Sequence, residues 1–136
     1  LTNALEPFDK GRGVIRIPTP RCAGCSNCGP NTAGCRNAWY KYYAYVRPEA
    51  LADGWTRDRI VAEITKQGVP AMQGSCSEMY LEKAFEGTGF RPEVHLPNAR
   101  ILGETSLMFL VHPTLTSEET KQSCATITDV LTRESK

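Results

Sequence analysis

The sequence has no long hydrophobic run, which argues against a membrane-spanning helix. Its longest apolar stretch, residues 107–111, is much shorter than the roughly 20 residues that such a helix needs. The first residues also lack the basic segment followed by an apolar segment that marks a secretory signal. We therefore expect a cytoplasmic protein that does not associate with membranes.

An excess of either charge is also missing. Sixteen Lys and Arg residues stand against fifteen Asp and Glu residues, and the formal net charge is +1. The basic residues are scattered, so no extended positive surface is expected to attract nucleic acid. With 40% hydrophobic and 23% charged residues, the composition is that of an ordinary globular domain.

A starting methionine is absent as well. Because the chain begins with Leu1, we expect it to be processed or to be part of a longer protein. Its 136 residues suffice for one domain with a hydrophobic core and are too few for two. We therefore treat residues 1–136 as a single domain.

The hydrophobic patterns present predict a small α/β domain. Short β-branched and aromatic runs predict strands, and spaced apolar residues behind capping residues predict helices. The expected strands are 14–17, 38–46 and 106–111, and we expect 38–46 to be a central strand whose tyrosines pack in the core. The expected helices are 57–67 with Thr56 as its N-cap, 77–86, 98–103 or slightly beyond, and a last one that begins after a capping box formed by Thr116 and Glu119. We expect a few-stranded, largely antiparallel sheet that helices cover on one face.

A cysteine-rich loop occupies residues 18–36 within this domain. Its four thiols, at Cys22, Cys25, Cys28 and Cys35, could bind zinc or an iron–sulfur cluster. Their spacing departs from the common zinc modules and from the ferredoxin pattern. A metal-free loop of reduced thiols is therefore the preferred interpretation, and a stand-alone metal-binding module is the alternative.

No catalytic motif is evident in the sequence. His95 and His112 have no spaced partners, and we expect them to be loop or strand-end residues. Cys76 could become a reactive thiolate at a helix start, but no general base is close in sequence. We expect Cys76, and still more Cys124 on an inward helix face, to be small buried hydrophobic residues.

The stretch 74–80, Gly-Ser-Cys-Ser-Glu-Met-Tyr, is the most informative of the chain. It follows a helix that is expected to end at Gly68, and it precedes a second helical pattern. Short polar residues at a helix start expose backbone N–H groups and hydroxyls. Such a corner is suited to an anionic or polyhydroxyl ligand.

Several ordered blocks resemble one enzyme family. These blocks are residues 39–46, the helix that ends at Gly68, residues 74–85 (GSCSEMYLEKAF), residues 96–99 (LPNA) and residues 106–116 (SLMFLVHPTLT). In this order they are similar to the C-terminal part of the DegT/DnrJ/EryC1/StrS aminotransferases. The resemblance covers about residues 14–133.

The resemblance implies a fold and an activity. Members of the family are pyridoxal-phosphate-dependent enzymes of fold type I that aminate keto-sugar nucleotides for lipopolysaccharide, O-antigen and antibiotic sugars. This chain would be their small C-terminal domain, without the large N-terminal domain that supplies the Schiff-base lysine. The isolated chain is then expected to be inactive, and the whole enzyme to be a homodimer.

The resemblance also points to substrate-side residues. In the family, the loop that matches residues 74–78 approaches the sugar-nucleotide site. By that match Ser75, Cys76, Ser77 and Glu78 are expected to bind substrate by hydrogen bonds, and no residue of this chain is expected to be catalytic or to bind metal. Cys76 stands where the family often has histidine, and the loop 18–36 replaces a usually short connection.

Overall fold

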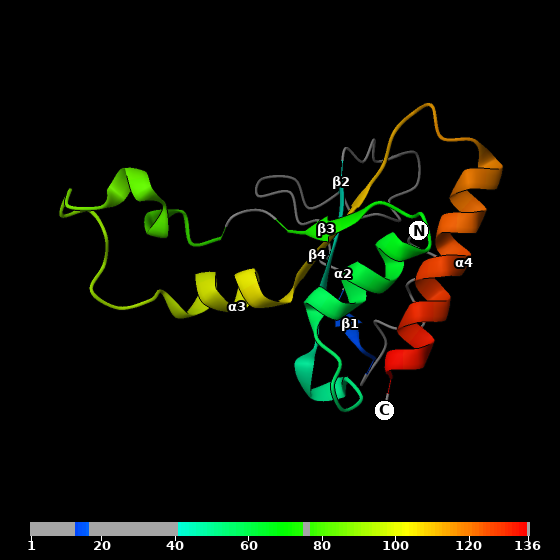
Figure 1. The fold of residues 1–136 in the computed structure, drawn as a ribbon, viewed down its shortest axis with the longest axis horizontal. Coiled ribbons are helices and arrows are strands. Elements are labelled where there is room, and N and C mark those ends of the chain that lie inside the picture. Colours follow the sequence, from blue (N-terminus) through cyan, green and yellow to red (C-terminus); the bar gives the residue numbers. More distant parts are fainter. Residues whose placement is uncertain (1–12, 17–40, 75–76, 136) are drawn as a thin grey trace, which may run out of the picture.

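The structure is a computed structural model, and it describes residues 13–16, 41–74 and 77–135. Four antiparallel strands form one sheet in the order β1-β2-β4-β3. The strands are β1 (Ile15–Arg16), β2 (Lys41–Val46), β3 (Ala71–Gln73) and β4 (Ser106–Leu110). Helices α2 (Arg57–Lys66) and α4 (Ser117–Glu134) pack against the sheet and against each other (Figure 1). The expected antiparallel sheet with covering helices is confirmed.

Strand β2 is central, as its aromatic run predicted. It pairs with β1 on one side and with β4 on the other. Burial alternates strictly along it: Tyr42, Ala44 and Val46 are buried, and the residues between them are partly exposed. Because side chains of a strand point alternately to its two faces, Tyr43 and Tyr45 lie on the face away from the core.

The core lies between this sheet and the two long helices. Its members are the inward residues of β2 and β4, the apolar stripe of α2 and the last turns of α4, among them Leu107, Phe109, Ile60, Ile64, Ile127, Val130 and Leu131. Cys124, expected to be buried, is only half-buried. It lies one turn before Ile127, towards the exposed half of α4.

The predicted helix boundaries hold for α2 and α4. The hydroxyl oxygen of Thr56 accepts a hydrogen bond from the Arg59 amide at the start of α2. The capping box of Thr116 and Glu119 is formed at the start of α4. Each of these two caps provides a hydrogen-bond acceptor for a backbone amide that has no acceptor within the helix.

Strand β3 was not expected from the sequence. It has only three residues, directly after the turn at Gly68, whose φ of 84° is suited to glycine. Its pairing with β4 depends on residues more than 30 positions away in the chain. A segment this short carries no detectable alternation of its own.

The helix expected over residues 77–86 does not form. Two short 3₁₀ turns, Met79–Leu81 and Lys83–Phe85, replace it. The Arg91 guanidinium donates hydrogen bonds to the carbonyls of Tyr80, Leu81 and Glu82, at 3.0, 2.7 and 3.2 Å. In an α-helix the amides four residues on would bind these carbonyls, so the tertiary contact competes with the helix.

Residues 77–105, which we name the arm, extend away from the rest of the domain. The arm contains the two 3₁₀ turns and helix α3 (Pro97–Thr105), which begins with proline and ends slightly beyond Gly103, both as predicted. Figure 1 shows the arm reaching out from the sheet while α2 and α4 stay close to it. None of the helices in the described part of the chain is long and apolar enough to cross a membrane.

Candidate functional site

An open hollow of about 310 Å³ lies where the arm meets the sheet. It is lined by Tyr43, Tyr45, Ser77, Leu102 and Ser106. The two tyrosines come from the face of β2 that points away from the core. The hollow therefore has aromatic and aliphatic walls and two serine hydroxyls, a mixture that suits a ring bearing polar groups.

Two glycines allow the walls to approach each other. A Cβ on Gly74 would overlap both side-chain atoms of Ser106, and a Cβ on Gly103 would lie 2.5 Å from the Ser77 hydroxyl oxygen. The Ser106 carbonyl accepts hydrogen bonds from the Gly74 amide at 3.2 Å and from Arg57 Nη1 at 2.9 Å. These contacts hold the base of the arm, including Ser77, against the start of β4.

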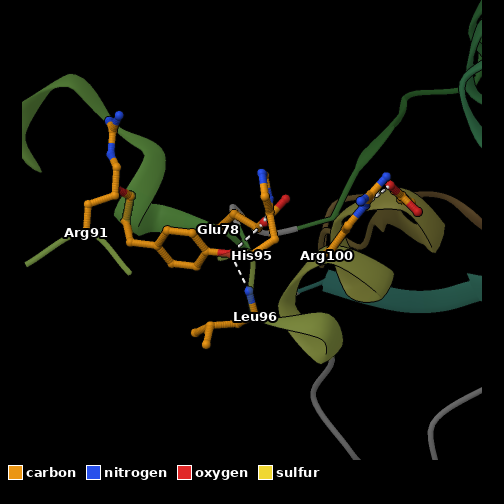
Figure 2. A network of polar contacts seen from close by, with 7 residues as sticks. Glu78, Arg91, His95, Leu96 and Arg100 are labelled. Atoms are coloured by element: carbon orange, nitrogen blue, oxygen red, sulfur yellow. Dashed lines mark hydrogen bonds and ion pairs between the residues drawn. The ribbon is translucent and has the colours of Figure 1, made fainter. Parts of the chain in front are cut away.

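Beyond the hollow, a polar network braces the arm (Figure 2). The Tyr80 hydroxyl donates to Glu78 Oε1 at 2.6 Å and accepts from the Leu96 amide at 2.9 Å. His95 Nδ1 lies 2.7 Å from the same Glu78 oxygen, where an Nδ1–H donates to the carboxylate. The network joins residue 78 to residues 95 and 96, the two sides of the arm.

The network shifts two pKa values in opposite directions. The hydrogen bond from Tyr80, and then that from His95, lowers the pKa of Glu78 because both stabilise its carboxylate. Loss of hydration, and then the bond to Glu78, raises the pKa of Tyr80. At neutral pH Glu78 is thus an anion and Tyr80 a neutral donor.

Two arginines flank this network in Figure 2. Arg91 lies over the 3₁₀ turn that it holds through backbone carbonyls. Arg100 donates to Glu104 at 2.8 Å one turn further along α3, and this contact raises the pKa of Arg100. Both cations face solvent in part and are paired with groups of the arm itself.

The predicted substrate-side residues are brought together only in part. Ser77 lines the hollow, and Glu78 is a member of the network next to it. Ser75 and Cys76 lie outside the described residues, as do the four cysteines of the loop 18–36. The hypotheses on their roles therefore stay predictions.

Sequence reasoning missed most of the surrounding site. Tyr43 and Tyr45 had been assigned to core packing, although the alternation along β2 already separated them from Tyr42. His95 was expected to be an unpartnered loop residue, yet it contacts Glu78. His112 is the loop residue that was expected, with its Nδ1 2.6 Å from the Thr114 hydroxyl.

The described residues offer no metal site. Among them, no three His, Cys, Asp or Glu side chains lie close enough together to hold an ion.

Comparisons with known proteins identify the fold. Over 96% of its length the chain matches an aminotransferase from Psychrobacter cryohalolentis with 46% identity and a TM-score of 0.79. A DegT DnrJ EryC1 StrS aminotransferase from Brucella abortus matches 93% of the chain with 21% identity and a TM-score of 0.58. The PLP form of a protein from Streptococcus pneumoniae that is assigned as a sugar aminotransferase matches 97% of the chain with 18% identity and a TM-score of 0.62. No protein-family model and no curated protein sequence matches the chain.

The chain thus has the fold of one domain of an aminotransferase. More particularly, the matches confirm the predicted resemblance to the small C-terminal domain of the DegT/DnrJ/EryC1/StrS aminotransferases. The chain spans only 31%, 27% and 30% of these three relatives.

Pyridoxal phosphate is the cofactor of these enzymes, and the relative from Streptococcus pneumoniae is known in both PLP and PMP forms. The lysines of the described residues do not fit a site for it. Lys66, Lys83 and Lys121 are exposed on helices or turns, and Lys41 begins β2. None of these four lines the hollow, so no step that involves the cofactor is assigned to them.

Proposed function

We propose that this chain is the small C-terminal domain of a pyridoxal-phosphate-dependent aminotransferase that transfers an amino group to a keto-sugar nucleotide. The whole enzyme would serve lipopolysaccharide or O-antigen biosynthesis as a cytoplasmic homodimer. The observation that carries the proposal is the 46% identity to an aminotransferase over 96% of this chain. The sugar substrate is supported by the relative from Streptococcus pneumoniae, which is assigned as a sugar aminotransferase.

In this proposal the hollow and its rim bind the sugar-nucleotide substrate. Ser75, Cys76, Ser77 and Glu78 act as hydrogen-bond partners, and Tyr43 and Tyr45 provide an apolar surface for a sugar ring. Stacking on an aromatic ring and hydrogen bonds to hydroxyls are complementary ways to hold a carbohydrate. Chemistry at the transferred amino group belongs to the part of the enzyme outside this chain.

The cofactor provides the first test. The whole protein, expressed from the complete reading frame, should show pyridoxal-phosphate absorbance that borohydride fixes to a lysine. This chain alone should show neither. A whole protein that binds no pyridoxal phosphate would refute the proposed function.

The substrate-side role has a separate test. In the whole enzyme, Ser77→Ala and Cys76→Ser should raise the KM for the keto-sugar nucleotide and leave the KM for the amino donor unchanged. Thr114→Ala, in the loop before α4, is the matched control. Equal effects of Ser77→Ala on both substrates would show a structural role instead.

The alternative of a stand-alone metal module depends on Cys22, Cys25, Cys28 and Cys35, which lie outside the described residues. Elemental analysis of protein purified under reducing conditions tests it. One equivalent of zinc or iron that disappears in Cys25→Ser would establish the alternative.

A further inference from the structure

Arg57 is a buried cation close to the base of the hollow. Its side chain is only 9% exposed, although it is the first residue of α2. Among the described residues its ion pair is with Asp58, through a contact of 2.7 Å from Nε to Oδ1. Asp58 is 68% exposed, so solvent screens the pair, and the pair alone does not explain why a guanidinium is buried here. A hydrocarbon side chain would fill the space without the cost of removing a charge from water.

The second contact of Arg57 indicates what the buried charge does. Its Nη1 donates to the Ser106 carbonyl at 2.9 Å, although the two residues are 49 positions apart in the chain. The cap at Thr56 places the first turn of α2, and with it Arg57. The Asp58 contact orients the planar guanidinium, and the Ser106 contact ties the start of β4 to α2.

Strand β3 is tied to the same point. Gln73 Nε2 donates to Asp58 Oδ1 at 3.2 Å, and this is the oxygen that Arg57 Nε also contacts. The next residue, Gly74, donates its amide to the Ser106 carbonyl, which is the acceptor for Arg57 Nη1. Arg57 and Asp58 therefore link the start of α2, the end of β3 and the start of β4 at the base of the arm.

Ser106 connects these contacts with the hollow. Its side chain lines the hollow, and its backbone directly follows Thr105, the last residue of α3. Leu102, near the end of α3, lines the hollow as well. In the antiparallel register Ser106 lies opposite Tyr45 of β2, so both side chains project from the same face of the sheet. A shift of the Ser106 backbone therefore moves α3 relative to β2 and changes the shape of the hollow.

We propose that Arg57 is a positioning residue for the sugar-nucleotide substrate, because it holds the Ser106 carbonyl and thereby keeps the hollow in the shape that binds this substrate. The inference rests on the proposed function, which assigns the hollow to the substrate. Arg57 does not line the hollow, so it acts through Ser106. A lysine cannot replace it fully, since one ammonium group cannot form both contacts of the guanidinium in the same geometry. Displacements of about 1 Å in a site are enough to weaken its function.

Steady-state kinetics of the whole enzyme tests the proposal, with UDP- and dTDP-linked keto-hexoses as probe substrates and L-glutamate as the amino donor. Arg57→Lys keeps the charge and is expected to fold, and Arg57→Met removes every donor. The KM for the keto-hexose should rise about three-fold in Arg57→Lys and about ten-fold in Arg57→Met, while kcat and the KM for glutamate stay within about two-fold of the wild type. Arg59→Lys is the matched control, because Arg59 lies two residues further on, stacks on Trp55 and should leave both KM values unchanged.

Hydrogen exchange in the same variants follows the contact itself. The Gly74 amide donates to the carbonyl that Arg57 holds, so it should exchange about ten-fold faster in Arg57→Lys and at the wild-type rate in Arg59→Lys. Unchanged Gly74 exchange, or an unchanged KM for the keto-hexose in both Arg57 variants, would overturn the proposal. Equal increases in both KM values, or a matching loss of kcat, would also overturn it, because they would show a general structural role. Pyridoxal-phosphate absorbance and amino transfer by the wild type test the proposed function separately, so the two failures are distinguishable.

Discussion

Gly74 lies so close to Ser106 that a Cβ on the glycine would overlap both Cβ and Oγ of the serine. Their backbones are joined by the hydrogen bond from the Gly74 amide to the Ser106 carbonyl. The contact fixes the end of β3 against the start of β4, at the point where the arm leaves the sheet. The position of the arm therefore depends on the absence of one side chain.

Replacing this glycine should destabilise the domain. Gly74→Ala is expected to lower the free energy of unfolding by about 1–3 kcal/mol, because the overlap with Ser106 Cβ cannot be relieved by a rotamer change. Gly103→Ala is the matched comparison. There only the Ser77 hydroxyl is close and can rotate, and alanine favours a helix over glycine by about 1 kcal/mol. Urea unfolding should rank Gly74→Ala as clearly less stable than Gly103→Ala, and the reverse order would contradict this account.

Glu134 should make stability depend on pH. Its side chain is completely buried near the end of α4, neither carboxylate oxygen has a hydrogen-bond partner among the described residues, and burial raises its pKa to about 8 in spite of the nearby Arg133. The ordinary value for the unfolded chain is 4.5. Between these two values the unfolded state releases the proton and the folded state keeps it. The contribution of Glu134 to stability is therefore fully present below pH 4.5 and is lost as the pH rises to about 8.

Glu134→Gln should remove this dependence. At pH 7 the variant is expected to be more stable than the wild type by about 2–4 kcal/mol, and at pH 4 the two should be nearly equal. Glu118→Gln on the exposed face of α4 is the control and should change stability little at either pH. Thermal or urea unfolding at several pH values provides the measurement. A constant difference between wild type and Glu134→Gln from pH 4 to pH 8 would show that folding does not raise the pKa of Glu134.

The capping box at the start of α4 should contribute measurably to stability. Thr116→Ala removes the acceptor for the Glu119 amide and should cost about 1 kcal/mol, while Thr116→Ser should retain most of the stability. The pKa of Glu119, which hydrogen bonds from the Thr116 amide and hydroxyl lower, should rise in the alanine variant. Unfolding experiments and a carboxylate titration by NMR test the two effects, and an unchanged Glu119 pKa would argue against the box in solution.

Tyr80→Phe should loosen the arm without unfolding the domain. The variant loses the hydroxyl that connects Glu78 to the Leu96 amide, and the pKa of Glu78 should rise because its first hydrogen bond is gone. Exchange of the Leu96 amide should become faster, while amides of α2 should be unaffected. Tyr43→Phe, on the sheet, is the matched control. Unchanged Leu96 exchange in Tyr80→Phe would mean that other contacts brace the arm.

Much of the fold was predictable because its signals are local. The aromatic run of β2, the cap at Thr56 and the box at Thr116 depend on neighbours within a few residues, and the structure has all three elements where they were expected. The family resemblance was carried by ordered blocks, and the matched structures confirm it. Ser77 lines the hollow, and its expected role as a substrate ligand stays a prediction.

Other features were beyond the sequence because they depend on distant partners. Residues 77–86 have the pattern of a helix, yet Arg91 donates hydrogen bonds to three of the carbonyls that would accept the helical hydrogen bonds. Strand β3 forms only because it pairs with β4. His95 contacts Glu78 only because the chain between them folds back within the arm.

By itself the sequence determined the central strand, the two long helices and the aminotransferase family, because propensity, capping and ordered motifs act over short distances. The tertiary structure alone decided the short strand, the shape of the arm and the hollow between Tyr43 and Ser77. These depend on contacts between residues far apart in the chain, such as Gly74 with Ser106. Their energies arise only when the sheet has brought both partners together.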